Sequence, residues 1–253
     1  MRVASVRASA GRAAASAGRR EFHVAPMRDY TDRHHRRFTR LLSREAKLWS
    51  EMEKPHAILK AADASGNKLD RLLSRGSDEG YEVFQIGGND PVTVAQATRL
   101  VLPYGYDELN LNCGCPSPKV AGKGAFGASL MLEPNLVAEC VAAMAENAGG
   151  APVTVKCRVG VDDKDSYDEL CAFIETVSGQ LPDCPSAGGK PLFAIHARKA
   201  LLNGLSPAEN RAVPPLRYEW VYALARDFPH VAFALNGGIV DIETASVIAN
   251  GDL

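Results

Sequence analysis

The stretch that decides the fold is ELNLNCGCP, residues 108–116, in which a short apolar strand runs directly into a turn. Glu108–Asn112 has the length of a buried β-strand, and a glycine and a proline follow it. Upstream, Pro91–Leu102 has a helical pattern that opens with an Asp-Pro pair, a helix cap followed by a proline suited to the first turn. Downstream, Pro134–Asn147 is a second helical pattern and Val153–Cys157 a second strand. This order predicts strands that pair in parallel.

The same alternation extends over most of the chain. The expected strands are Phe22–Pro26, Lys47–Glu51, Glu82–Ile86, Glu108–Asn112, Val153–Cys157, Leu192–His196 and Val231–Leu235. The expected helices are Thr31–Ser43, Pro91–Leu102, Pro134–Asn147, Asp165–Val177, Tyr218–Asp227 and Asp241–Ala249. Two polar segments, Asn67–Gly80 and Gly179–Lys190, are expected to be loops. Since a TIM (β/α)8 barrel needs eight units, we expect an α/β barrel that is truncated after its seventh βα unit.

The bulk composition is typical of a globular protein. The chain has 253 residues, 46% of them hydrophobic and 23% charged, which is enough for one large domain. The net charge of −1 means that any surface for nucleic acid must be local. No apolar run approaches the roughly 20 residues that span a bilayer, so no membrane association is expected. The six cysteines lack disulfide density and paired zinc spacing, which predicts a reducing compartment and no metal.

The first 20 residues differ from the rest. They contain five arginines, many alanines and serines, and no acidic residue. This composition is typical of a transit peptide, which predicts a plastid or mitochondrial location; the alternative is a disordered basic tail on a cytoplasmic protein. We therefore expect a leader at residues 1–20 and a catalytic barrel domain at residues 21–253.

Polar side chains follow the predicted strands at their carboxyl ends. In a parallel barrel these ends meet at one mouth, where such folds carry out their chemistry. Amides, a lysine and a histidine gathered there would be costly to bury without a polar ligand. Taken singly, His196 could be structural, Lys156 could reach solvent and Asn236–Gly238 could be a turn. The residues concerned are Gln85, Asn112, Cys115, Lys156, His196, Asn236, Gly237 and Gly238.

These group types suit a flavin. The ring presents carbonyls and nitrogens, and Lys156 could stabilise its anionic reduced form. Gln85 offers a donor and an acceptor to the pyrimidine edge. The backbone at Pro26–Arg28 could line the dimethylbenzene side, and the turn at Asn236–Gly238 offers N–H groups to a phosphate.

Cys115 stands out among the cysteines because it lies in a Cys-Gly-Cys-Pro turn at the expected mouth. Cys140 and Cys171 fall in helical patterns and are expected to be packing residues. The Cys113–Cys115 pair could also bind a metal or form a redox pair, but no other ligand stands at suitable spacing.

Together these residues resemble the tRNA-dihydrouridine synthases, most closely the A subgroup. The resemblance runs from about Phe22 to Gly238. Its carriers are VAPMRDYTDRHHRRFTRLLS, FQIGGNDP, YDELNLNCGCPS, FGASLM, PVTVKCRVGVDDKDSY, HARKALLNGLSPAENRAVPPL and FALNGGI. The family fold is a flavin-binding TIM barrel followed by a small helical domain, and the helical domain is expected to be absent from this chain.

The resemblance implies NADPH- and FMN-dependent reduction of the C5–C6 double bond of uridine 20 or 20a in the tRNA D-loop, or the reverse oxidation. It implies Cys115 as the proton donor, and Asn112, Arg198 and Arg211 as residues near the base or the tRNA. The partners it implies are tRNA and NADPH, and we expect a monomer. The residues it implies for FMN are Pro26, Met27, Arg28, Gln85, Lys156, His196, Asn236, Gly237 and Gly238.

Two alternatives remain open. One is another FMN barrel acting on a small molecule, such as a dihydroorotate dehydrogenase or an ene-reductase. The other is a non-catalytic tRNA-binding module that has lost its flavin.

Overall fold

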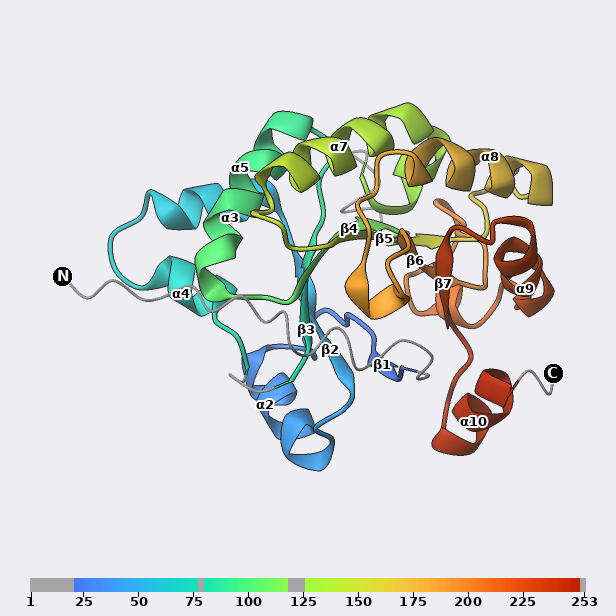
Figure 1. The fold of residues 1–253 in the computed structure, drawn as a ribbon, viewed down its shortest axis with the longest axis horizontal. Coiled ribbons are helices and arrows are strands. Elements are labelled where there is room, and N and C mark those ends of the chain that lie inside the picture. Colours follow the sequence, from blue (N-terminus) through green and yellow to red (C-terminus); the bar gives the residue numbers. More distant parts are fainter. Residues whose placement is uncertain (1–20, 77–79, 118–125, 251–253) are drawn as a thin grey trace.

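The computed structural model describes residues 21–76, 80–117 and 126–250. Within this part of the chain, seven parallel strands pair in sequence order to form one sheet, with β1 and β7 at its edges (Figure 1). The strands are β1 (His23–Val24), β2 (Lys47–Glu53), β3 (Glu82–Ile86), β4 (Glu108–Cys113), β5 (Val153–Arg158), β6 (Leu192–His196) and β7 (Ala232–Asn236). This is the curved α/β sheet of a TIM-like barrel, as predicted. The proposed leader, residues 1–20, lies outside the described residues.

Helices connect the strands and cover one face of the sheet. The longer ones are α2 (Arg33–Leu42), α3 (Pro55–Ala62), α4 (Lys68–Leu73), α5 (Pro91–Val101), α7 (Pro134–Asn147), α8 (Tyr167–Ser178), α9 (Tyr218–Asp227) and α10 (Ile242–Asn250). Helix α5 packs against α3 and α7, and α7 packs against α8, so that they follow one another along the sheet (Figure 1). None of the described helices combines the length and the apolar composition needed to cross a membrane.

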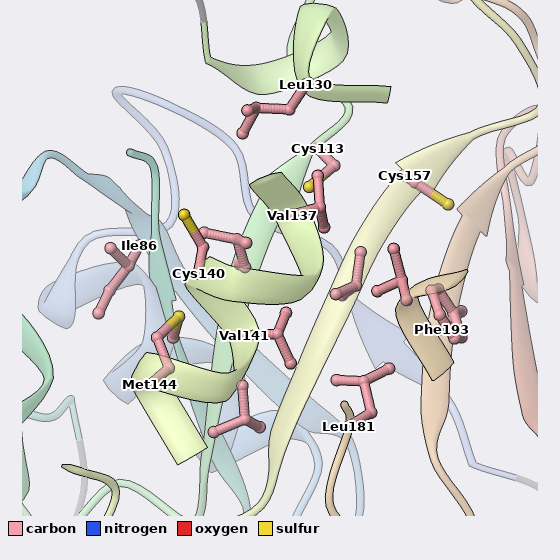
Figure 2. Close-up of a cluster of buried hydrophobic side chains, with 14 of the residues drawn as sticks. Ile86, Cys113, Leu130, Val137, Cys140, Val141, Met144, Cys157, Leu181 and Phe193 are labelled. Atoms are coloured by element: carbon pink, nitrogen blue, oxygen red, sulfur yellow. The ribbon is translucent and has the colours of Figure 1, made fainter. Parts of the chain in front are cut away.

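The main core lies between the sheet and these helices. Helix α7 begins at Pro134, in the first helical position, and buries Val137, Val141 and Met144 at helical spacing. Figure 2 shows this stripe packed against side chains from β4 and β5. The sheet face that carries Leu109, Leu111 and Cys113 is therefore apolar, and alternate residues of β4 point to the other face.

Two helices were not predicted. Helix α3 follows β2, and helix α4 occupies the first half of the polar segment Asn67–Gly80 that we expected to be a loop. The leucines of α4 explain the difference, because Leu73 is fully buried and Leu69 and Leu72 pack against the core. The segment was predicted as a loop because most of its residues are polar, although its three leucines have helical spacing. The first strand is also shorter than predicted, since only His23–Val24 pairs with β2.

Candidate active site

Three of the predicted strand-end residues meet at the carboxyl ends of β5, β6 and β7. Lys156 Nζ donates a hydrogen bond of 2.9 Å to Oδ1 of Asn236, which crosses the intervening strand β6. His196 ends that strand and lies directly opposite Asn236 in the register. A Cβ placed on Gly237 would lie 2.5 Å from Cδ2 of His196, so only a glycine fits beside the imidazole. The sequence therefore grouped Lys156, His196 and Asn236–Gly237 correctly in space.

The imidazole of His196 is buried and incompletely bonded. Only 8% of the residue is exposed, and Nε2 has no hydrogen-bond partner among the described residues. Burial, with the positive charges of Lys156 and Arg158, lowers the pKa of His196 to about 2. The ring is therefore neutral at physiological pH, and it lies near the cations of the mouth, a group that we call the mouth cluster. A buried polar atom without a partner in a cluster of this kind is suited to bind a ligand.

Asn112 and Gln85 are linked to each other and to the Cys115 turn. Oδ1 of Asn112 accepts from the backbone N–H groups of Gly114 (3.1 Å) and Cys115 (3.0 Å). Nδ2 of Asn112 donates to Oε1 of Gln85 at 2.9 Å. The resemblance implied a place for Asn112 near the substrate base. Within this chain its carboxamide holds the turn that carries Cys115.

Cys115 and Cys113 lie in different environments, although one residue separates them. Cys115 is half-buried in the turn after β4, and its carbonyl accepts from the backbone N–H of Ala128 at 2.9 Å. Cys113 is fully buried among the core side chains beneath α7 (Figure 2), and burial raises its pKa well above the ordinary value. Burial likewise raises the pKa of Cys140 and of Cys157 to about 12. Of these thiols, Cys115 is the one placed to react.

Arg158, at the end of β5, was not predicted as a site residue. It is 3% exposed, and its Nε donates to the carbonyl of Gly114 at 2.8 Å. Its Nη1 donates to the carbonyls of Lys199 and Asn210 at 3.1 and 3.0 Å. Arg158 therefore ties the Cys115 turn to the loop after β6. Its place after Lys156 at a strand end was the available signal, but its carbonyl partners cannot be recognised in a sequence.

Four cations lie near His196: Lys156, Arg158, Arg198 and Arg211. Both Arg198 and Arg211 contribute to the lowered pKa of His196, which places them near the mouth. Arg198 donates to the carbonyl of Pro214, while Arg211 is exposed in the 3-10 turn Glu209–Arg211. None of the four has a carboxylate partner among the described residues. The mouth is therefore a concentration of uncompensated positive charge.

The segment Pro26–Arg28 lies in the loop after β1. Met27 is 42% exposed, and its carbonyl accepts from the N–H groups of Tyr30 and Thr31. Among the described residues, no hydrogen bond or ion pair joins this segment to Lys156 or His196. Its grouping with them at a cofactor stays a prediction.

The geometry defines an α/β-barrel protein with a cluster of cations at the carboxyl ends of its strands. A crystal structure of a Burkholderia cenocepacia J2315 protein described as a candidate lyase/mutase shares the fold: the TM-score is 0.51 at 13% identity, covering 90% of this chain and 73% of that one. The chain belongs to the dihydrouridine synthase family, which it matches over residues 23–251.

Individual relatives agree with this assignment. The chain is 50% identical to the tRNA-dihydrouridine(20/20a) synthases of Salmonella typhimurium and Escherichia coli K12, over 88% of its own length. It is 48% identical to the enzyme of that name from Xanthomonas campestris, again over 88%. The chain spans 60–63% of the length of these relatives. The A-subgroup resemblance is thus confirmed.

Proposed function

We propose that the chain takes part in the reduction of uridine in tRNA to 5,6-dihydrouridine, at position 20 or 20a, with FMN as cofactor and NADPH as reductant. The observation that carries this proposal is the mouth cluster: among the described residues, four cations without carboxylate partners lie near His196, whose Nε2 is unpaired, and one of them, Arg158, contacts the Cys115 turn. The names of the relatives supply the reaction class.

The mouth residues fit a flavin. Lys156 is a half-buried cation whose only hydrogen-bond partner in the described residues is the neutral amide of Asn236. Burial, with the charge of Arg158, lowers the pKa of Lys156 to about 8, so it is still mainly protonated at neutral pH. A partly desolvated cation of this kind is stabilised by an anion, which is the form that a reduced flavin ring takes. Lys156 and His196 would hold the ring.

The glycine turn after β7 fits the same ligand. Gly237 and Gly238 have φ values of 104° and 71°, which favour glycine. Tyr218 OH donates to the Gly237 carbonyl at 2.5 Å and holds the turn in place. Backbone N–H groups in a turn without side chains can approach a phosphate closely. Asn236, Gly237 and Gly238 would therefore bind the polar end of FMN.

Cys115 would supply the proton. FMN, when bound and reduced by NADPH, supplies the hydride that adds to C6 of the uracil. Addition at C6 leaves negative charge on C5 and O4, and a thiol at the mouth can protonate C5. The target uridine must be turned out of the RNA stack to reach the mouth. Arg198 and Arg211 would contact RNA phosphates, since cations without a carboxylate partner attract them.

The test uses the full chain with unmodified tRNA and NADPH. We expect the purified chain to be yellow and to form dihydrouridine, measured by mass spectrometry of tRNA digests. Cys115→Ala should keep the flavin colour and slow turnover by about 100-fold or more, the usual contribution of a general acid. Cys171→Ala, on the outer helix α8, is the matched control and should leave turnover unchanged.

Two results would overturn the proposal. Unchanged turnover in Cys115→Ala would exclude it as the acid. A colourless chain that binds tRNA without forming dihydrouridine would favour a non-catalytic binding module.

We also propose that residues 1–20 direct the protein to a plastid or mitochondrion, on the basis of their five arginines and lack of acidic residues. Fusion of residues 1–20 to a fluorescent protein should direct it to one of these organelles, and a diffuse cytoplasmic signal would refute the idea.

A further inference from the structure

A chain of side-chain hydrogen bonds begins at the Cys115 turn and runs down the inner face of the sheet, opposite the helices. Strand β4 places Glu108, Asn110 and Asn112 on this face. Nδ2 of Asn112 donates to Gln85 Oε1, and Nε2 of Gln85 donates to Asn110 Oδ1, each at 2.9 Å. The two amides of β4 are thus joined through a third amide on β3.

The chain continues to the opposite end of the sheet. Nδ2 of Asn110 donates to Thr154 Oγ1 at 2.8 Å, and that hydroxyl donates to Glu108 Oε1 at 2.7 Å. The other oxygen of Glu108 accepts from Lys47 Nζ at 3.1 Å and from Tyr81 OH at 3.2 Å. Glu108, Asn110, Asn112 and Thr154 are all buried. We call the series from Asn112 to Glu108 the amide ladder.

Every bond of the amide ladder points the same way. A carboxamide can turn over and exchange its oxygen with its nitrogen, so an isolated chain of amides has two possible directions. Here both ends are fixed. The backbone N–H groups of Gly114 and Cys115 can only donate, and the carboxylate of Glu108 can only accept. Glu108 requires a donor from Thr154. Each amide between Thr154 and the mouth must therefore point its NH₂ group toward Glu108 and its oxygen toward the mouth.

We propose that Glu108, at the far end of the ladder from the mouth, is a positioning residue for Cys115. Its carboxylate fixes the direction of the amides, which keeps Oδ1 of Asn112 under the N–H groups of the Cys115 turn. The carboxylate also fixes the orientation of Gln85. The carbonyl of Gln85 accepts from Asn112, one N–H donates to Asn110, and the second N–H remains available as a donor. The proposal rests on the proposed function only for the role of Cys115 as acid.

Reversal of the ladder shows what the carboxylate prevents. If an amide replaced Glu108, its oxygen could face Lys47 while its NH₂ group faced Thr154. The amides above could then turn over one after another. The last of them, Asn112, would present NH₂ to the N–H groups of Gly114 and Cys115, and donor would face donor. The turn would lose the acceptor that holds it.

Lys47 keeps the end of the ladder charged. Its side chain is 2% exposed and contacts the carboxylates of Glu108 and Glu21, each at 3.1 Å. Although burial alone lowers it, these two carboxylates raise the pKa of Lys47 above its ordinary value. The ion pair also receives support from Ser186, which accepts from Lys47 Nζ at 2.8 Å.

The test compares Glu108→Gln, which permits reversal, with Thr154→Val, which cuts the ladder without changing side-chain shape. Thr154→Ser keeps the hydroxyl and is the matched control. The first readout is amide hydrogen exchange in the peptide that contains Gly114 and Cys115. The second is the rate at which iodoacetamide alkylates Cys115, followed by mass spectrometry. Neither needs flavin or tRNA.

We expect Glu108→Gln and Thr154→Val to speed both exchange and alkylation by about fivefold or more, the equivalent of one lost hydrogen bond of about 1 kcal/mol. Thr154→Ser should match the unmodified protein. If Glu108→Gln does not fold, the exchange and alkylation rates of Thr154→Val test the proposal by themselves. A variant that is less stable overall but exchanges and alkylates Cys115 at the unmodified rate would overturn the proposal, because the ladder would then be structural only.

The two proposals can fail separately. If the chain forms no dihydrouridine but both variants loosen the Cys115 turn, the proposed function fails and the ladder stands. If the chain is active and neither variant changes exchange, alkylation or turnover, the ladder fails and the proposed function stands.

Discussion

The inner face of the sheet has a lysine at each end: Lys47 is buried at the base, the end opposite the mouth, and Lys156 is half-buried at the mouth. At the base, Lys47 contacts two carboxylates, a hydroxyl and the face of the Tyr81 ring. At the mouth, Lys156 contacts one neutral amide and lies near the guanidinium of Arg158. Although burial lowers the pKa of both lysines, carboxylates raise that of Lys47 above its ordinary value, whereas the pKa of Lys156 falls to about 8.

The contrast separates structural charge from charge that serves a ligand. The base is compensated by its own side chains and needs no partner. Among the described residues, the cations of the mouth have no carboxylate partner, and Nε2 of His196 has no hydrogen-bond partner. Removal of the lysine charge at the base should therefore lower stability, whereas removal of the lysine charge at the mouth should chiefly affect binding.

The largest expected effect is at the base. Lys47→Met should lower the free energy of unfolding by about 3–5 kcal/mol, because Glu108 would remain buried without its cation. Denaturant titration measures this change. A loss below about 1 kcal/mol would show that the base does not depend on its ion pair.

A steric change at the mouth should come next. Gly237→Ala places a methyl group 2.5 Å from the His196 ring at a φ of 104°, and we expect a loss of about 2–3 kcal/mol. Gly204→Ala is the control, since its φ is 84° but nothing lies within 4 Å of the new carbon. It should lose only about 1 kcal/mol in the same titration. Equal losses would mean that contact with His196 is unimportant.

The pH dependence of stability should reveal His196. Burial, Lys156 and Arg158 lower its pKa from 6.5 to about 2, so below pH 6.5 the unfolded chain binds a proton that the folded protein excludes. The stability that His196 contributes is present above pH 6.5 and is lost as the pH falls. The loss is at most about 1.4 kcal/mol per pH unit. Thermal melts of the protein and of His196→Gln from pH 7 to 5 should diverge, and parallel curves would contradict the assignment.

The smallest effect on folding is expected at Lys156. Lys156→Met should leave the free energy of unfolding within about 1 kcal/mol of the unmodified value, since it removes a half-buried cation that has no carboxylate partner among the described residues. The same substitution should remove the flavin absorbance if FMN binds as proposed. A stability loss as large as that of Lys47→Met would show that Lys156, like Lys47, is a structural charge.

Much of this arrangement could be predicted from the sequence, because local patterns encode strands and their ends. The seven strands follow from short apolar runs, and parallel pairing then brings Lys156, His196 and Asn236 to one mouth. Hydrogen bonds between side chains that are far apart in the sequence could not be predicted. Thr154 and Glu108 are 46 residues apart, and Lys47 and Glu108 are 61 apart, so their bonds depend on the register between strands. Arg158 was overlooked because it binds backbone carbonyls, which leave no mark on a sequence.

The alternation along β4 also bears on how the chain folds. Leu109, Leu111 and Cys113 face the helices, and Glu108, Asn110 and Asn112 face the other way. If β4 slipped by one residue during folding, every side chain would change faces. A carboxylate and two amides would then be buried in the apolar layer beneath α5 and α7 without partners, at a high cost in free energy. The side chains of the amide ladder therefore also specify the register of β4 in the sheet.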